Sequence, residues 1–218
     1  MTETSTAPAR RAGPSRRNAI VGLAAAALVA AIAFDTTVVR IGSDADLREQ
    51  AFDPDAYGRD QFPRIRDVVI ARAADAPALA EKLDTDKTAA IADHGRMAGA
   101  FPVLAVSFSG TVGDGTSGIF GVDVPGMPDG VSIRVQTGPA INGTELRDIP
   151  GDIVFGDFTN QIEYQDAGAG INRAMAAATL DGLDRDALPG KTVSVTGVFT
   201  LINPASWLVT PVTFEVQP

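Results

Sequence analysis

The chain has 218 residues and a net charge of -9, and 45% of its residues are hydrophobic, which suits one domain of ordinary size with appendages. It contains no cysteine and a single histidine. This composition excludes disulfide scaffolds, cysteine-ligated zinc, iron–sulfur clusters, lipid attachment through cysteine, and metal sites built from several histidines.

The N-terminal segment has the pattern of a membrane-targeting sequence. Residues 1–18 are rich in arginine, and an uncharged apolar run follows directly. We predict a basic cytoplasmic tail over 1–18 and a transmembrane anchor over 19–39, because about 20 apolar residues span a bilayer and arginines stay on its cytoplasmic side. A cleaved signal segment is the alternative, since Ala31-Ile32-Ala33 fits a small-x-small cleavage site. Either way we expect the C-terminal part to be periplasmic; with an anchor, the protein is a single-pass protein of the inner (cytoplasmic) membrane.

Residues 43–97 are predicted to form short helices. Asp53-Pro54, and Asp75 followed by Pro77, place capping carboxylates beside prolines that start helices well. Pro63 predicts the start of a further helix, with apolar residues at helical spacing after it. Since these helices are small and rich in alanine, we expect them to lie against something larger.

From residue 101 the apolar residues alternate with polar ones, as in strands. Three strands, a helix over 166–182 and two further strands are the order of an OB-type barrel. We therefore predict a mainly β (α+β) protein, with an OB-like small β-barrel over 101–218. Gly113-Asp114-Gly115 predicts the turn between the first two strands. The predicted strands are 103–112, 119–124, 131–135, 193–201 and 208–216, with extra short strands at 153–155 and 161–164.

The sequence offers no convincing catalytic group. A hydrolase would need His94 as its base, beside a nucleophile exposed on a sharp turn. No Gly-x-Ser-x-Gly motif is present, and Ser117 lies in a glycine-rich hairpin turn. We predict no catalytic residues and no enzyme, and we keep a hydrolase using His94 as a third hypothesis.

Metal, cofactor and nucleic-acid sites are not expected either. The glycines of 110–118 join two strands without a following lysine, unlike a phosphate-binding loop. Asp123 and Asp129 are too few carboxylates for calcium. The acidic exported part offers only Phe120 and Arg134 on its second and third strands, so it would repel a phosphate backbone.

The stretch 142–166 has the densest polar composition and is the predicted ligand site. Amides and carboxylates beside Phe158 and Tyr164 are the groups that a sugar or polyol site uses. The alternative is architectural: the same groups cap turns and hold a long crossover over the barrel. The candidate ligand-binding residues are Asn142, Thr144, Arg147, Asp148, Asp157, Asn160, Gln161 and Glu163.

Several stretches of the chain resemble an uncharacterised bacterial family of predicted periplasmic lipoproteins. The stretches are 138–148, 158–164, 190–197 and 210–212, with looser matches at 52–57 and 95–96, and the resemblance covers roughly residues 35–217. It implies an envelope protein with an OB-like barrel, often encoded beside sugar-type ABC transporter genes, and it provides no established catalytic residues. The chain departs from the family because it has no cysteine to carry a lipid, so an apolar helix must replace the lipid as the tether.

Together these observations predict a non-enzymatic accessory or binding module held at the cytoplasmic membrane through residues 19–39. Components of a sugar ABC transporter are the expected partners. The alternative is a structural or assembly module of the cell envelope, in which 142–166 is purely architectural.

Overall fold

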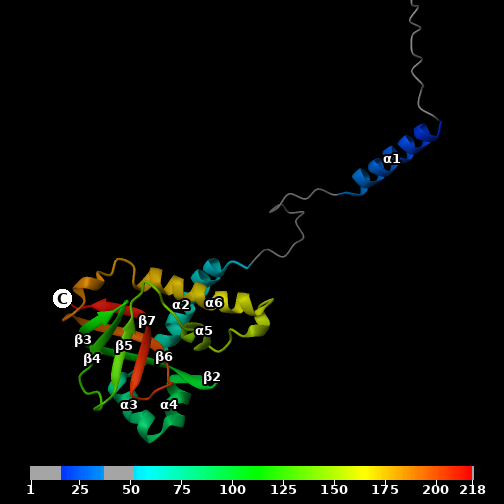
Figure 1. Cartoon of the computed structure of the whole chain (residues 1–218). Coiled ribbons are helices and arrows are strands. Elements are labelled where there is room, and N and C mark those ends of the chain that lie inside the picture. Colours follow the sequence, from blue (N-terminus) through cyan, green and yellow to red (C-terminus); the bar gives the residue numbers. More distant parts are fainter. Residues whose placement is uncertain (1–15, 37–51, 218) are drawn as a thin grey trace, which may run out of the picture. The chain divides into compact units, whose positions relative to one another are not determined.

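The computed structural model describes residues 16–36 and 52–217 (Figure 1). The chain forms two units, residues 1–51 and residues 52–218, which we describe separately. Three predicted segments lie outside the described residues: the tail up to residue 15, the end of the predicted anchor at 37–39, and the start of the predicted helical region at 43–51.

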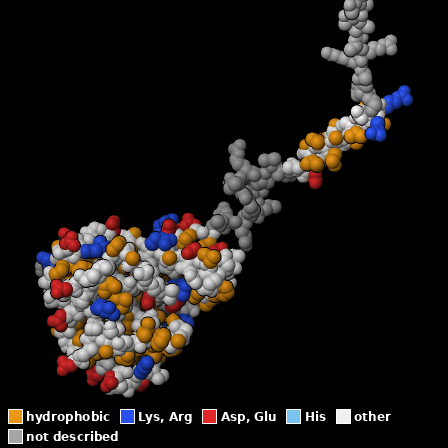
Figure 2. Space-filling view, viewed as in Figure 1, with side chains coloured by type: hydrophobic (Ala, Val, Ile, Leu, Met, Phe, Trp, Pro, Cys, Tyr) orange, Lys and Arg blue, Asp and Glu red, His pale blue; other side chains and the backbone are white. Residues whose placement is uncertain are grey.

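The first unit contains the helix α1 (Arg16–Asp35), which has a mean hydropathy of 1.9 and no buried residue. Figure 2 shows an apolar surface along this helix and basic side chains at one end. The length and composition of α1 are those of a helix that can cross a bilayer. No other helix in the part of the chain that the structure describes meets these criteria. A signal sequence meets the same criteria, so an anchor that is retained stays a prediction.

The second unit begins with three helices: α2 (Pro54–Arg72), α3 (Ala76–Thr85) and α4 (Lys87–His94). Asp53 caps α2 as predicted, because its carboxylate accepts hydrogen bonds from the backbone N–H groups of Asp55 and Ala56. The prediction that Pro63 starts a separate helix is wrong. Pro63 lies inside α2 on its exposed side, where the carbonyl that proline leaves without a helical partner is open to solvent. Apolar residues on the opposite side hold the helix together.

The sheet is built around β3 (Phe101–Thr116), which pairs with β6 along its first part and with β4 at its end. The other strands are β1 (Ala74–Asp75), β2 (Gly95–Ala98), β4 (Ile119–Asp123), β5 (Ser132–Gln136), β6 (Thr192–Thr200) and β7 (Ser206–Val216). Five of them follow the order β3-β4-β5-β7-β6, and β6 returns to β3. This order, with a helix between β5 and β6, is that of the OB fold. The predicted α+β class and OB-like topology are confirmed, but the protein is not mainly β, because helices hold more of the described residues than strands do.

Two hydrophobic clusters pack against the two faces of the sheet. Successive side chains of β3 point to opposite faces and so belong alternately to one cluster and the other. One cluster includes Trp207 stacked on Phe199, with ring centroids 4.5 Å apart, and is covered by α3 and α4. The other cluster packs α2 and α6 (Gln161–Thr179) against the sheet, as Figure 1 shows. The short N-terminal helices therefore do lie against a larger body, as expected.

The helices α2 and α6 cross at two glycines. A Cβ atom at Gly58 would lie 2.8 Å from the backbone nitrogen of Ile171, and one at Gly170 would lie 2.6 Å from the carbonyl carbon of Pro54. Real Cβ atoms essentially never come so close to other atoms. The backbones of the two helices are therefore in direct contact, and a residue larger than glycine at either position would push them apart.

Two local predictions are wrong. Residues 113–115 do not form the turn, because β3 continues to Thr116 with a register shift and the chain reverses at Ser117 and Gly118, both at positive φ. The extra strands at 153–155 and 161–164 are replaced by a 3-10 helix, η1 (Phe155–Asp157), and by the first turn of α6. The predicted helix over 166–182 accordingly begins and ends earlier, at Gln161 and Thr179.

Candidate functional site

The candidate site lies on the crossover that leads from β5 through the short helix α5 (Glu145–Asp148) and η1 to α6. The buried Gln136 at the end of β5 holds the start of this crossover. Its side-chain nitrogen donates to the carbonyl of Asn142 over 3.2 Å, and its side-chain oxygen accepts from the backbone N–H of Asn142 over 3.3 Å. From α6, Asn172 Nδ2 donates to the carbonyl of Gly143 over 2.9 Å. The 142–144 turn is thus fixed from the sheet and from the helix.

Arg147 is the central side chain of the site and is only 7% exposed. Its Nε donates to Asp148 Oδ1 over 2.9 Å and its Nη1 donates to the carbonyl of Tyr164 over 3.1 Å. The guanidinium carbon lies 3.8 Å from the centre of the Tyr164 ring, which is cation–π geometry. Thr144 Oγ1 donates to Asp148 Oδ2 over 2.6 Å and so positions the carboxylate. The guanidinium is therefore held in place, and Nη2 makes no hydrogen bond to the described residues.

A surface pocket of about 390 Å³, which we call the amide pocket, lies on one side of Arg147. Four predicted ligand residues line it, namely Asn142, Thr144, Arg147 and Gln161, together with Gln165 and Asn172. Within the described residues, the side-chain amides of Asn142, Gln161 and Gln165 make no hydrogen bond to the protein, and no carboxylate lines the pocket. Free amides present donors and acceptors together, which suits a ligand rich in hydroxyl groups.

The other four predicted residues have local partners. Asp148 pairs with Arg147, and Asp157 Oδ2 accepts from the backbone N–H of Val154 over 3.1 Å. Asn160 is the N-cap of α6 and accepts from the backbone N–H groups of Ile162 and Glu163. Glu163 Oε2 accepts in turn from the backbone N–H of Thr159 over 3.0 Å. The structure thus gives Asp157, Asn160 and Glu163 architectural contacts and places them outside the amide pocket.

The aromatic side chains of the stretch pack against each other. Phe158 contacts Phe52, Tyr57 and Tyr164, with ring centroids 5.5 to 5.6 Å apart. The ring of Tyr164 carries Arg147 on its face and Phe155 against it at 5.9 Å. Phe158 is therefore occupied by protein contacts, whereas Tyr164 also lines the amide pocket beside its polar groups.

A second pocket of about 390 Å³, which we call the arginine pocket, shares Arg147 and Tyr164 with the first. It is also lined by Arg96 on β2 and by Gly151 and Val154 on the crossover. Arg96 is not among the predicted ligand residues, since it lies far along the chain from 142–166. The pairing of β2 with β3 brings it to the crossover.

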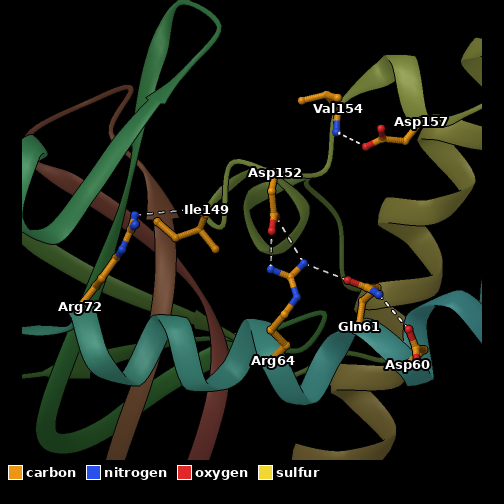
Figure 3. A network of polar contacts seen from close by, with 8 residues as sticks. All are labelled: Asp60, Gln61, Arg64, Arg72, Ile149, Asp152, Val154 and Asp157. Atoms are coloured by element: carbon orange, nitrogen blue, oxygen red, sulfur yellow. Dashed lines mark hydrogen bonds and ion pairs between the residues drawn. The ribbon is translucent and has the colours of Figure 1, made fainter.

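Polar contacts with α2 fix the wall of the arginine pocket (Figure 3). Arg64 Nη1 donates to Asp152 Oδ2 over 2.7 Å, and Gln61 accepts from the same guanidinium. Arg72 Nη1 reaches the carbonyl of Ile149 at 3.5 Å. The segment from Ile149 to Asp152 is therefore attached to a long helix.

His94 has a structural partner. Its Nδ1 lies 2.9 Å from the carbonyl oxygen of Arg72, and because a carbonyl only accepts, Nδ1 carries the proton. This bond joins the end of α4 to the end of α2. Residues 16–36 and 52–217 contain no group of three or more His, Cys, Asp or Glu side chains that could hold a metal ion.

Comparison with known proteins places this fold. A family model described as "Predicted periplasmic lipoprotein (DUF2291)" matches residues 23–215. The crystal structure of an OB-fold protein from Thermotoga maritima is similar with a TM-score of 0.60 at 18% sequence identity, over 77% of this chain and 100% of that chain. No curated protein matches the sequence significantly. The matched span covers most of the 218 residues, and the chain therefore belongs to the family of predicted periplasmic lipoproteins of unknown function.

Proposed function

We propose that the protein is a non-enzymatic binding module on the outer side of the cytoplasmic membrane, and that its amide pocket takes a sugar or another small polyol. The observation that carries the proposal is the convergence of Asn142, Thr144, Arg147 and Gln161 in one pocket of about 390 Å³. Polar groups without protein partners face water in that pocket, and a ligand with many hydroxyl groups replaces such water contacts directly.

The proposed membrane attachment is through residues 19–39, retained as a single-pass anchor. The sequence has no cysteine for a lipid, and α1 has the length and hydropathy of a span with Arg16 and Arg17 at its start. Arginines before an apolar span stay in the cytoplasm, so residues 52–218 would face the periplasm. Protease added to spheroplasts should digest residues 52–218, whereas recovery of the full-length chain in lipid-free cytosol would refute this placement.

A sugar ABC transporter is the partner in this proposal, supported by the family resemblance of the sequence. Co-purification of the tagged chain with the components of such a transporter would support the partnership. Purification from solubilised membranes without any transporter component would count against it.

Calorimetry with a panel of mono- and disaccharides tests the binding role, with the full chain held in phosphatidylcholine nanodiscs. We expect Asn142→Ala combined with Gln161→Ala to weaken binding at least tenfold, because two free amides are lost from the pocket. Both residues are exposed, so stability should not change. The matched control is Gln217→Ala, an exposed amide outside the pocket. Absence of heat with every sugar would refute the proposed ligand class.

The second candidate is a structural or assembly module of the envelope, favoured by the capping contacts of Asp157, Asn160 and Glu163. The pair Asn160 and Gln161 separates the two functions, because only Asn160 caps α6 and only Gln161 lines the pocket. If Asn160→Ala lowers the Tm while Gln161→Ala changes neither the Tm nor any binding, the stretch is architectural.

A further inference from the structure

We infer that the arginine pocket is a separate binding site for an amphiphilic anion, a molecule with one carboxylate or phosphate head and an apolar tail. The inference does not depend on the sugar proposal, although Arg147 contributes to both pockets. The head would bind at Arg96 and Arg147, and the tail would lie on the apolar part of the wall.

The charges in the pocket are not balanced. Two arginines, Arg96 and Arg147, and one carboxylate, Asp148, line the pocket, and Asp148 is paired with Arg147. Asp152, the next carboxylate along the segment, is bound to Arg64 on α2 (Figure 3). Arg96 forms no ion pair within the part of the chain that the structure describes; its Nε only approaches the carbonyl of Met97 at 3.4 Å. One uncompensated guanidinium therefore lines the pocket of a protein with a net charge of -9, and it attracts an anion.

The backbone positions this guanidinium. Gly151 has a φ of +88°, and a Cβ atom built on it would overlap the Arg96 guanidinium, so the side chain lies directly against bare backbone. An arginine held in this way loses less conformational entropy on binding than one that is free in solvent. Any other residue at 151 would both strain the backbone and move Arg96.

One part of the wall is apolar and open to the surface. Met97, Ala98, Ile153 and Val154 line the pocket, and the first and last of these are 51% and 50% exposed. Phe101 pairs with Ala98 in the β2–β3 ladder and is also exposed. An apolar surface beside an unpaired cation matches a molecule that is anionic at one end and apolar over the remainder.

Calorimetry with three probes tests the site on the full chain in phosphatidylcholine nanodiscs. Octyl phosphate has both the head and the tail, inorganic phosphate has only the head, and 1-octanol has the tail with an uncharged head that is not a sugar. We expect octyl phosphate to bind at least tenfold more tightly than either of the other two. Equal affinity for octyl phosphate and inorganic phosphate would overturn the inference.

Variants locate the binding. Arg96→Gln should weaken octyl phosphate at least tenfold, Arg96→Lys should retain part of the affinity through its charge, and Arg59→Gln, which removes an exposed arginine elsewhere, should change nothing. An Arg96→Gln variant that binds as the parent does would overturn the site. Asn142→Ala combined with Gln161→Ala should leave octyl phosphate binding intact. Sugar binding and octyl phosphate binding are therefore measured independently, and the sugar proposal can fail without affecting this one.

A bilayer lipid and a free amphiphile are distinguished by the disc composition. If phosphatidylglycerol in the disc lowers the apparent affinity for octyl phosphate in an Arg96-dependent way, the natural head belongs to a membrane lipid. If affinity is the same in both discs while the Arg96 dependence persists, the ligand is a free amphiphile.

Discussion

Replacing Gly170 by alanine tests the close crossing of α2 and α6. A Cβ atom at residue 170 would lie 2.6 Å from the carbonyl carbon of Pro54, whereas ordinary van der Waals contact begins at 3.4 Å. Because the obstacle is backbone, the two helices must move apart, and overpacking of this severity costs about 3 kcal/mol. Alanine recovers about 1 kcal/mol of helix propensity. We expect a net loss of about 2 kcal/mol, which lowers the Tm by about 4–8 °C in a domain of this size.

The matched control is Gly168→Ala, two residues earlier in the same helix. There a Cβ atom would meet only the side chains of Arg147 and Thr144, at 3.8 and 3.9 Å, so the propensity gain should remain and raise stability by about 1 kcal/mol. Thermal and urea unfolding followed by circular dichroism would measure the difference of about 3 kcal/mol between the two variants. Equal shifts of the same sign would show that the helices are not in backbone contact.

Three further predictions concern caps and charges. Asn160→Ala should cost about 1 kcal/mol in thermal unfolding, because it removes the N-cap of α6, while Gln161→Ala should change stability by only a few tenths of a kcal/mol. Burial raises the pKa of Glu145 from its usual 4.5, so its proton stabilises the fold at low pH and this contribution is lost as the pH rises through the raised pKa. Glu145→Gln should therefore raise the free energy of unfolding at pH 7 relative to the parent but not at pH 4; an equal effect at both values would argue against a buried carboxylate. Asp152→Asn should cost less than about 1 kcal/mol in urea unfolding, because both partners of its ion pair with Arg64 are exposed, at 62% and 43% of their side chains.

The chain order of β3 to β7 was predictable because each of these strands has its own alternation of apolar and polar residues and one helix interrupts them. The short strands β1 and β2 were missed, since both lie in the segment 43–97 that was predicted to be helical. The helix starts were partly predictable, since Asp53 before Pro54 is a capping pattern that needs no tertiary contact. The prediction at Pro63 was wrong because a proline interrupts a helix less when it lies on the exposed side, and packing decides which side is exposed. The turn was misplaced because Gly113-Asp114-Gly115 is a strong local turn pattern, whereas the real reversal uses Ser117 at a φ of +55°.

The candidate site was only partly predictable, for a related reason. Polar density points to 142–166, but it does not separate residues that cap helices from those that line a pocket. The spacing of Asn160 and Glu163 is a capping pattern that could have identified both as architectural. Asn172 and Arg96 join the pockets through helix packing and strand pairing, and no local pattern in the sequence reveals either neighbour.

The placement of β3 has a consequence for how the polypeptide acquires its shape. Its residues from Val103 to Thr111 remain an open ladder edge until β6 arrives, and Val103 pairs with Thr200, close to the end of the chain. Such long-range pairing slows folding, because a long loop must close before the contacts between β3 and β6 can form. Removal of β6 should therefore leave this edge of β3 without its partner and destabilise the sheet.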